Sequence, residues 1–186
     1  SYLDLMRVAA ILKGKTVHPT VSLSIAPGSK QVYNMLAKNG ALADIIASGA
    51  RVLECACGPC IGMGQSPNSG GVSLRTFNRN FEGRSGTADG QVYLVSPETA
   101  AASALTGMFT DPRTLGAWEK IEMPQSFLIN DNMIVEPAPD YLSETVEVLR
   151  GPNIKPFPVS GPLPESITTK AILKVGDNIT TDHIMP

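Results

Sequence analysis

The sequence predicts an α/β fold: a three-layer domain with a mostly parallel sheet, followed by an extended proline-rich linker and the first strand of a second domain. Two observations lead to this prediction. Over the first 110 residues, short strand-like runs alternate with helical patterns, which is the order of βαβ units in a parallel sheet. Nine of the fifteen prolines then fall between residues 111 and 170, where proline would supply no donor for strand pairing.

The elements of the first domain follow from periodicity and from turn residues. Apolar residues at helical spacing predict a helix over 2–13, and alternation over 21–26 predicts a strand that breaks at Pro27-Gly28. Ser29 is a suitable cap for the next helix, which ends at Asn39-Gly40. The remaining predicted elements are a helix that closes at Gly49, strands over 51–53, 72–76 and 91–95, and an alanine-rich helix over 97–106.

Composition divides the chain into three parts. Residues 1–110 form the α/β domain, and residues 111–170 form an interdomain linker in which only 141–149 is typical of a short helix. Residues 171–186 begin a second domain, with Ala171 to Val175 as its first strand. Because the chain opens without a methionine and ends soon after a polar run, we expect it to be a piece of a longer polypeptide.

Charge and hydropathy exclude some classes of partner. The chain has 15 basic and 17 acidic residues, a net charge of −2, without the basic excess that usually accompanies binding to nucleic-acid phosphates. No apolar stretch is long enough to span a membrane, and no export signal is visible. Clustered, unpaired cysteines indicate a reducing compartment, so we expect a cytoplasmic protein, with the mitochondrial matrix as the alternative.

All three cysteines lie within six positions, at Cys55, Cys57 and Cys60. Such a cluster is typical of a site, and clustered thiolates suit an iron–sulfur cluster, a zinc ion or a redox dithiol. The glycine-rich run that follows would not propagate the helix that a redox dithiol needs. His18 and His183 lack the pair spacing of zinc ligands. Iron–sulfur ligation is therefore favoured, with three inert buried thiols as the alternative.

Three arginines lie within ten residues after a predicted strand: Arg75, Arg79 and Arg84. Guanidinium groups bind carboxylates through two parallel hydrogen bonds, and loops at the carboxyl ends of parallel strands commonly form sites. A di- or tricarboxylate would suit Arg79 and Arg84. The alternative is a solvated turn with surface arginines.

Together these segments resemble the aconitase superfamily in order and spacing. The resemblance is carried by Cys57-Gly58-Pro59-Cys60-Ile61-Gly62, by Asn78-Arg79-Asn80-Phe81-Glu82-Gly83-Arg84, and by Ser96-Pro97-Glu98. The run from Gly176 to Ile184 is similar to the opening of that family's swivelling last domain. The resemblance implies that the chain is the family's third α/β domain with its linker and the start of the swivel domain.

The resemblance also implies a [4Fe–4S] cluster and its ligands. Cys57 and Cys60 match two of the three ligand cysteines of the family, and the third is expected just upstream of Ser1. Cys55 occupies a position where aconitases need no thiol, so it is treated as a neighbour. With two of three thiolates, this chain alone is expected to be inactive.

The implied activity is that of a hydro-lyase that removes and re-adds water. One iron of the cluster, without a protein ligand, would bind the hydroxyl and a carboxylate of the substrate. Arg79 and Arg84 match substrate-binding arginines, and Asn78 lies beside the cluster. Asp182 is the catalytic candidate in this chain, since the serine base of the family lies beyond its last residue. Arg75 precedes the motif and is expected to matter less.

The implied substrate is a small tricarboxylate. The segment Cys57 to Gly62 favours the aconitase branch, which isomerises citrate and isocitrate through cis-aconitate. Related isomerases or dehydratases of the isopropylmalate, homoaconitate or methylcitrate type are the alternative. Another alternative is RNA binding, as in some relatives that have lost the cluster, and the net charge argues against it. The expected partners are the remaining domains of the same polypeptide.

Overall fold

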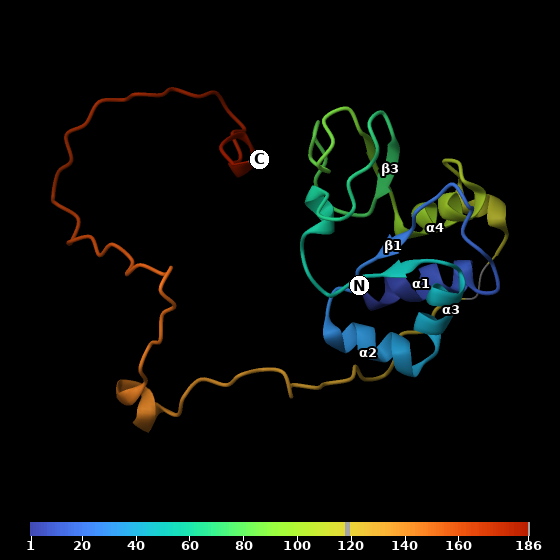
Figure 1. Ribbon diagram of the computed structural model, residues 1–186, viewed down its shortest axis with the longest axis horizontal. Coiled ribbons are helices and arrows are strands. Elements are labelled where there is room, and N and C mark those ends of the chain that lie inside the picture. The colour runs from blue at the N-terminus through green and yellow to red at the C-terminus, as the bar shows by residue number, and fades with distance from the viewer. Residues whose placement is uncertain (118–119, 186) are drawn as a thin grey trace. The chain divides into compact units, whose positions relative to one another are not determined.

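The structure, a computed structural model, describes residues 1–117 and 120–185. The chain divides into two compact units, Ser1–Asp131 and Asn132–Pro186. The first unit contains the helices and strands that Figure 1 labels and confirms the predicted α/β fold. Its elements are α1 (Tyr2–Leu12), β1 (Ser24–Ile25), α2 (Lys30–Lys38), α3 (Ala41–Ala47), β2 (Arg51–Val52), the 3₁₀ helix η1 (Pro59–Ile61), β3 (Val72–Arg75), β4 (Gln91–Leu94), α4 (Pro97–Thr106) and the 3₁₀ helix η2 (Pro112–Leu115).

The described strands form two short parallel sheets, where the sequence predicts one. In the first sheet β1 pairs with β2, and Ser24 stands opposite Arg51. In the second, β3 pairs with β4 over four residues, from Val72 opposite Gln91 onward. The alternation over 21–26 is longer than β1, because only residues with a paired backbone become strand. Residues of both sheets, including Ser24 of β1 and Arg75 of β3, line one open cavity of about 770 Å³.

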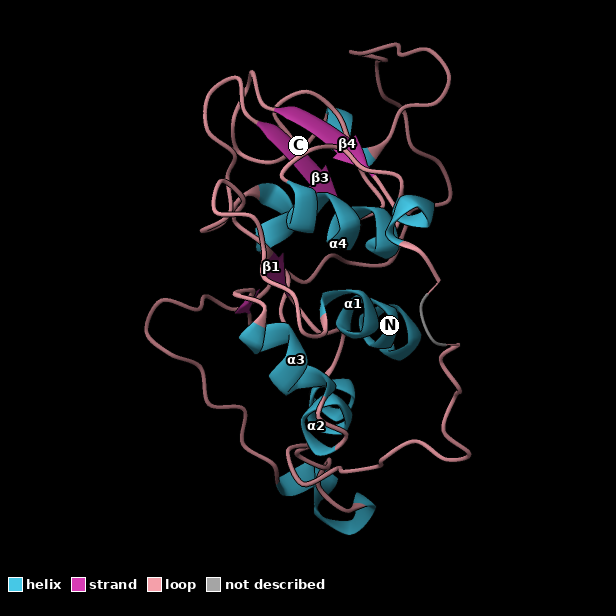
Figure 2. Cartoon of the chain, turned by 90° about the vertical axis from the view of Figure 1, so that its right-hand side faces the viewer, coloured by secondary structure: helices cyan, strands magenta, loops and turns pink. Residues whose placement is uncertain are grey.

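The core lies where the helices meet beside β1 and β2. Helix α1 packs against α4 and α3, and α2 packs against α3 (Figure 2). Helix α4 presents small buried side chains, including Ala101 and Ala102, which allow a neighbouring helix to approach closely. The largest fully buried side chains are Ile11, Leu12, Leu36, Ile45 and Ser48.

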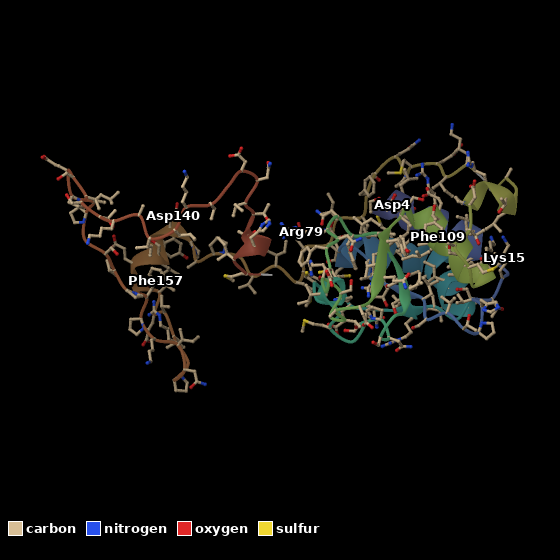
Figure 3. All side chains as sticks on the ribbon, turned by 90° about the horizontal axis from the view of Figure 1, so that it is seen from above. Asp4, Lys15, Arg79, Phe109, Asp140 and Phe157 are labelled. Atoms are coloured by element: carbon tan, nitrogen blue, oxygen red, sulfur yellow. The ribbon has the colours of Figure 1, made fainter. Side chains whose placement is uncertain are left out.

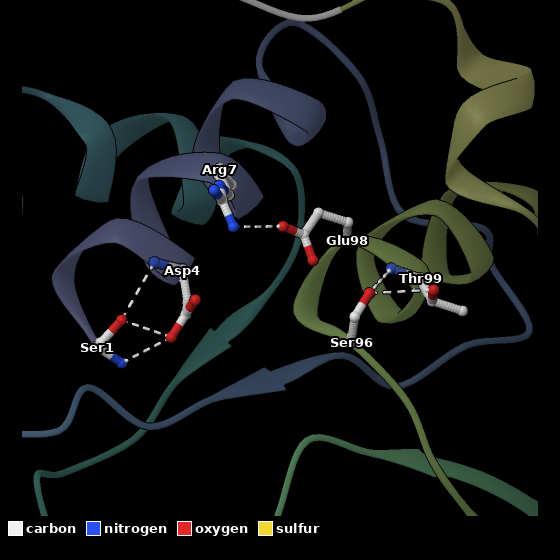
Figure 4. A network of polar contacts seen from close by, with 6 residues as sticks. All are labelled: Ser1, Asp4, Arg7, Ser96, Glu98 and Thr99. Carbon is white, nitrogen blue, oxygen red and sulfur yellow. Dashed lines mark hydrogen bonds and ion pairs between the residues drawn. The ribbon is translucent and has the colours of Figure 1, made fainter. Parts of the chain in front are cut away.

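Polar contacts fix the helix ends and join two of the helices. The predicted cap is confirmed, because Ser29 Oγ accepts a hydrogen bond from the Val32 amide at 3.2 Å. Between α1 and α4, Arg7 Nη1 donates to Glu98 Oε1 at 3.0 Å (Figure 4). Helix α4 ends at Gly107 with φ of 76°, where a β-carbon would lie 2.6 Å from the His18 ring. Glycine is therefore required at this helix end.

The second unit carries exposed, extended chain, as its prolines predict. Its described residues form two short 3₁₀ helices, η3 (Asp140–Thr145) and η4 (Thr181–His183). The helix predicted over 141–149 is thus shorter and of the tighter type. The strand predicted over 171–175 does not form, since no described segment pairs with it, and Ile172 is 97% exposed. Phe157, labelled in Figure 3, is also largely exposed.

Two further expectations from the sequence concern the limits of the domains and the absence of a membrane-spanning segment. Residues up to Asp131 stay with the first unit, and Gln31 Nε2 donates to Asp131 Oδ1 at 3.4 Å. The predicted domain limits at residues 110 and 170 remain predictions. No helix that the structure describes has the length and apolar character needed to cross a membrane.

Truncating Leu12 tests the core. Leu12 has no exposed surface, so Leu12→Ala removes apolar contacts, leaves a cavity and should lower the free energy of unfolding by about 2–5 kcal/mol. Urea unfolding of this chain, followed by circular dichroism, measures the loss. The matched control Leu163→Ala, at a position that is 87% exposed, should change stability by less than about 0.5 kcal/mol. Equal losses in both variants would contradict this assignment of the core.

Candidate functional site

The cysteines lie on a loop that leaves β2 and is shaped by glycines. The 3₁₀ helix η1 (Pro59–Ile61) is the only helical element among the described residues between β2 and β3. At Gly62, φ is 94°, and a β-carbon would lie 2.2 Å from the Ser85 carbonyl oxygen. Only glycine fits this approach, which brings the cysteine loop against the loop that carries the arginines.

Two of the three thiols come together. The Sγ atoms of Cys57 and Cys60 are 3.5 Å apart, well beyond a disulfide bond length of about 2.05 Å, and both cysteines are free. Cys57 is exposed and Cys60 is half-buried. Cys55 is also half-buried, and its thiol makes no hydrogen bond with the described residues. The structure thus brings together the pair of the Cys-x-x-Cys motif and leaves Cys55 outside it.

Arg84 lies directly beside Cys60. Its Nη1 donates to the Cys60 carbonyl at 3.3 Å, and its Nη2 lies 3.8 Å from the Cys60 thiol. The guanidinium carbon is also 5.9 Å from the centre of the Phe81 ring. Burial raises the pKa of the Cys60 thiol, but hydrogen bonds from Cys57 and Arg84 lower it more, so this pKa lies below its usual value. Cys60 therefore loses its proton more readily than an ordinary cysteine.

Residues 78–82 of the arginine loop are exposed. Asn80 Nδ2 donates to the Val92 carbonyl at 2.6 Å, which ties the loop to β4. Asn78 and Arg79 are exposed on the same loop, and Figure 3 shows Arg79 at the edge of the unit. The structure therefore brings Arg84 into contact with Cys60. Asn78 and Arg79 lie on the same loop, which the Asn80 hydrogen bond ties to β4.

Arg75 has a place in the site that its position before the motif did not suggest. Its guanidinium is half-buried and donates to the carbonyls of Pro59 and Gln65, on either side of Cys60. Burial lowers the pKa of this guanidinium, whereas the charge of the Cys60 thiolate raises it. Sequence spacing gives no signal for these contacts, because they join segments 10 and 16 residues apart.

Asp182 belongs to η4 in the second unit, and its side chain lies outside the described residues. Within the part of the chain that the structure describes, no group of three or more His, Cys, Asp or Glu side chains is arranged to hold a metal ion. The donors that do meet are two unbridged thiols, one exposed and one beside a guanidinium. Soft thiolate donors of this kind fit a share of the ligands of an iron–sulfur cluster.

Known proteins with similar sequences include homoaconitases and 3-isopropylmalate dehydratase large subunits. The mitochondrial homoaconitase of Candida parapsilosis is 37% identical over 195 residues, which cover 98% of this chain and 27% of that protein. The 3-isopropylmalate dehydratase large subunit 1 of Methanopyrus kandleri is 45% identical over 114 residues, 60% of this chain and 27% of that protein. The homoaconitase large subunit of Thermus thermophilus is 42% identical over 113 residues, 60% of this chain and 27% of that protein.

This chain therefore spans about a quarter of the length of the curated relatives that it matches. Residues 1–107 match the profile of the aconitase family, described as aconitate hydratase. That stretch is more than half of the chain, and it contains both the thiol pair and the arginine loop. On this match the chain belongs to the aconitase family.

Proposed function

We propose that this chain contributes metal ligands and substrate-binding arginines to an aconitase-like hydro-lyase. The observation that carries the proposal is the contact of three side chains: Cys57 and Cys60 with thiols 3.5 Å apart, and Arg84 against Cys60. A pair of soft metal ligands beside a cationic carboxylate binder suits a reaction that removes water from a hydroxy acid and adds it back to the unsaturated acid. The third ligand and the base would come from other parts of the full protein.

Cys57 and Cys60 would hold the cluster, and Arg84 would orient the substrate. When bound, a [4Fe–4S] cluster supplies a Lewis acid that assists departure of a hydroxyl group. Arg84 is half-buried, and it forms no ion pair with a carboxylate of the described residues. A guanidinium has five N–H donors, and contacts with Cys60 use two of its nitrogens, so donors remain for a substrate carboxylate. Partial burial strengthens such a charge-assisted pair.

Arg79 and Asn78 would contact the substrate or cluster from the exposed side of the same loop. The anchor at Asn80 keeps this loop on β4, so that both side chains stay at the end of the unit that carries the thiols. Two arginines on one loop would bind two carboxylates of one substrate. This supports a di- or tricarboxylate as the substrate class.

Among hydroxy acids, we favour a substrate of the homoaconitate or isopropylmalate type. The relatives described above are named homoaconitase and 3-isopropylmalate dehydratase, so they favour the alternative over the citrate and isocitrate expected from the cysteine motif. The fungal homoaconitases match 98% of this chain, whereas the large subunits match about 60%. This difference favours an arrangement in which residues 132–186 lead to a further domain of the same polypeptide.

The cellular location follows the same comparisons. The fungal relatives are named mitochondrial, which favours the mitochondrial alternative over the cytoplasmic expectation. Mitochondria are the location that we propose.

Cysteine variants test the ligand assignment. In the full-length protein, Cys57→Ser or Cys60→Ser should abolish the broad visible absorption of a thiolate-ligated iron–sulfur cluster, because a hydroxyl is a poor substitute for a thiolate. Cys55→Ser is the matched control and should keep the absorption and the iron content. Loss of the cluster in Cys55→Ser alone would show that Cys55 is a ligand.

The choice of substrate can be tested directly. Full-length protein with its cluster should turn over homoisocitrate or 3-isopropylmalate with a kcat/KM at least about tenfold above that for isocitrate, a difference of about 1.4 kcal/mol in transition-state binding. Steady-state assays with the three acids at equal iron content provide the comparison. If isocitrate were the best substrate, the proposal would be wrong and the original prediction of citrate and isocitrate as substrates would hold.

Arg84→Lys tests the carboxylate clamp. The substitution keeps the charge but removes the planar fork, so kcat/KM should fall more than about tenfold, as for a buried charged pair worth about 2–5 kcal/mol. Arg113→Lys is the matched control, because Arg113 is exposed and pairs only with Asp111, whose pKa it lowers to about 2. Wild-type rates in a cluster-loaded Arg84→Lys protein would place the clamp elsewhere.

A further inference from the structure

Among the described residues, no backbone–backbone hydrogen bond joins the loop that carries the thiol pair, residues 57–66, to the rest of the domain. Every backbone–backbone hydrogen bond of residues 57–66 that the structure describes joins two residues of the loop itself. Examples are the Ile61 amide to the Gly58 carbonyl at 3.0 Å and the Gln65 amide to the Gly62 carbonyl at 3.0 Å. The position of the loop therefore depends on side chains that reach it from other elements.

The Arg75 side chain donates hydrogen bonds to carbonyls near both ends of this loop. It is the last residue of β3, and its Nη1 donates to the Pro59 carbonyl at 2.8 Å. Its Nη2 donates to the Gln65 carbonyl at 2.6 Å. Pro59 directly precedes Cys60, and Gln65 follows it by five residues. One guanidinium thus closes the loop around the thiol.

The orientation of the guanidinium is itself fixed. Nε of Arg75 donates to Ser73 Oγ at 2.8 Å, on the same strand. Because the guanidinium is planar, this third contact sets the directions of both Nη groups. On the other side of the loop, Ser24 Oγ of β1 donates to Gln65 Oε1 at 2.8 Å. The loop is therefore tied to β3 and to β1.

We propose that Arg75 is a positioning residue for Cys60, acting by clamping the Pro59–Gln65 loop to β3. The proposal rests on the proposed function only in treating the Cys60 thiol as a metal ligand. Nε, Nη1 and Nη2 of Arg75 each donate to an acceptor within the domain, so its guanidinium is oriented by β3 and by the loop. Arg75 would affect metal binding indirectly, by fixing the position of the Cys60 thiol.

The test uses full-length Arg75→Lys, which keeps the charge but cannot donate to two carbonyls in a fixed plane. Hydrogen exchange of the cluster-free protein, read by mass spectrometry, should rise about tenfold or more in peptides covering 57–66, because hydrogen bonds to a charged group are lost. Exchange in α1 and α4 should stay unchanged. In the loaded protein, bleaching of the visible absorption by an iron chelator should be about tenfold faster than in the wild type.

Two controls separate the clamp from general stability. Arg113→Lys should change neither measurement, since Arg113 is exposed. Ser73→Ala keeps the guanidinium but removes the contact to Nε, so it should shift both measurements in the same direction by a smaller factor. If Arg75→Lys fails to fold, Ser73→Ala provides the test in its place.

Each outcome is decisive. Faster loop exchange together with faster cluster loss supports the proposal. Unchanged loop exchange overturns it, and so does faster exchange with an unchanged rate of cluster loss, which would mean a purely structural brace. If the wild-type protein takes up no cluster, the proposed function fails, and the clamp is then judged on exchange alone.

Discussion

The site depends on guanidinium contacts to a loop that forms no backbone–backbone hydrogen bond with the described strands. A strand fixes its neighbour through a row of backbone hydrogen bonds. The backbone–backbone hydrogen bonds of residues 57–66, in contrast, all join two residues of the same loop. Arg75 and Arg84 instead donate to its carbonyls from β3 and from the loop after it. Arginine suits this task because one rigid group carries several donors, so each contact restrains the others. The thiols can therefore lie on an irregular, glycine-rich segment and still have a defined position.

The same contacts connect the site with the packing of the domain. The two sheets share no strand pairing, yet Ser24 of β1 and Arg75 of β3 both bind Gln65. The loop that carries Cys60 thus bridges the sheets across their cavity. Behind it, the small side chains of α4 and the Arg7–Glu98 ion pair hold α4 against α1. That ion pair is only partly exposed, so water screens it less than a surface pair.

What the sequence predicted well was local in the chain. Helices α1, α2 and α4 follow periodicity and serine caps, which act within a few residues, and the Cys57–Cys60 pair is three residues apart. Strand pairing is not local, so one sheet was expected where two exist, and 171–175 was expected to be a strand although it has no described partner. Arg75 was expected to matter less than Arg79 and Arg84, and its contacts were not predicted for the same reason: its acceptors lie 10 and 16 residues away, and no spacing rule relates them. The contact of Arg84 with Cys60 was not predicted either, because the family resemblance implied only that Arg84 binds substrate.

The identity of the substrate was the part least accessible from motifs, and the contacts explain why. Thiolates bind metal, and guanidinium groups bind carboxylates, which hydroxy di- and tricarboxylic acids have in common. Homoaconitase and 3-isopropylmalate dehydratase are named for different acids, yet each matches more than half of this chain. Residues that bind the shared part of such substrates cannot distinguish between them, because discrimination arises where the substrates differ. A cysteine motif therefore identifies the reaction class, and specificity must lie in side chains that contact the rest of the acid.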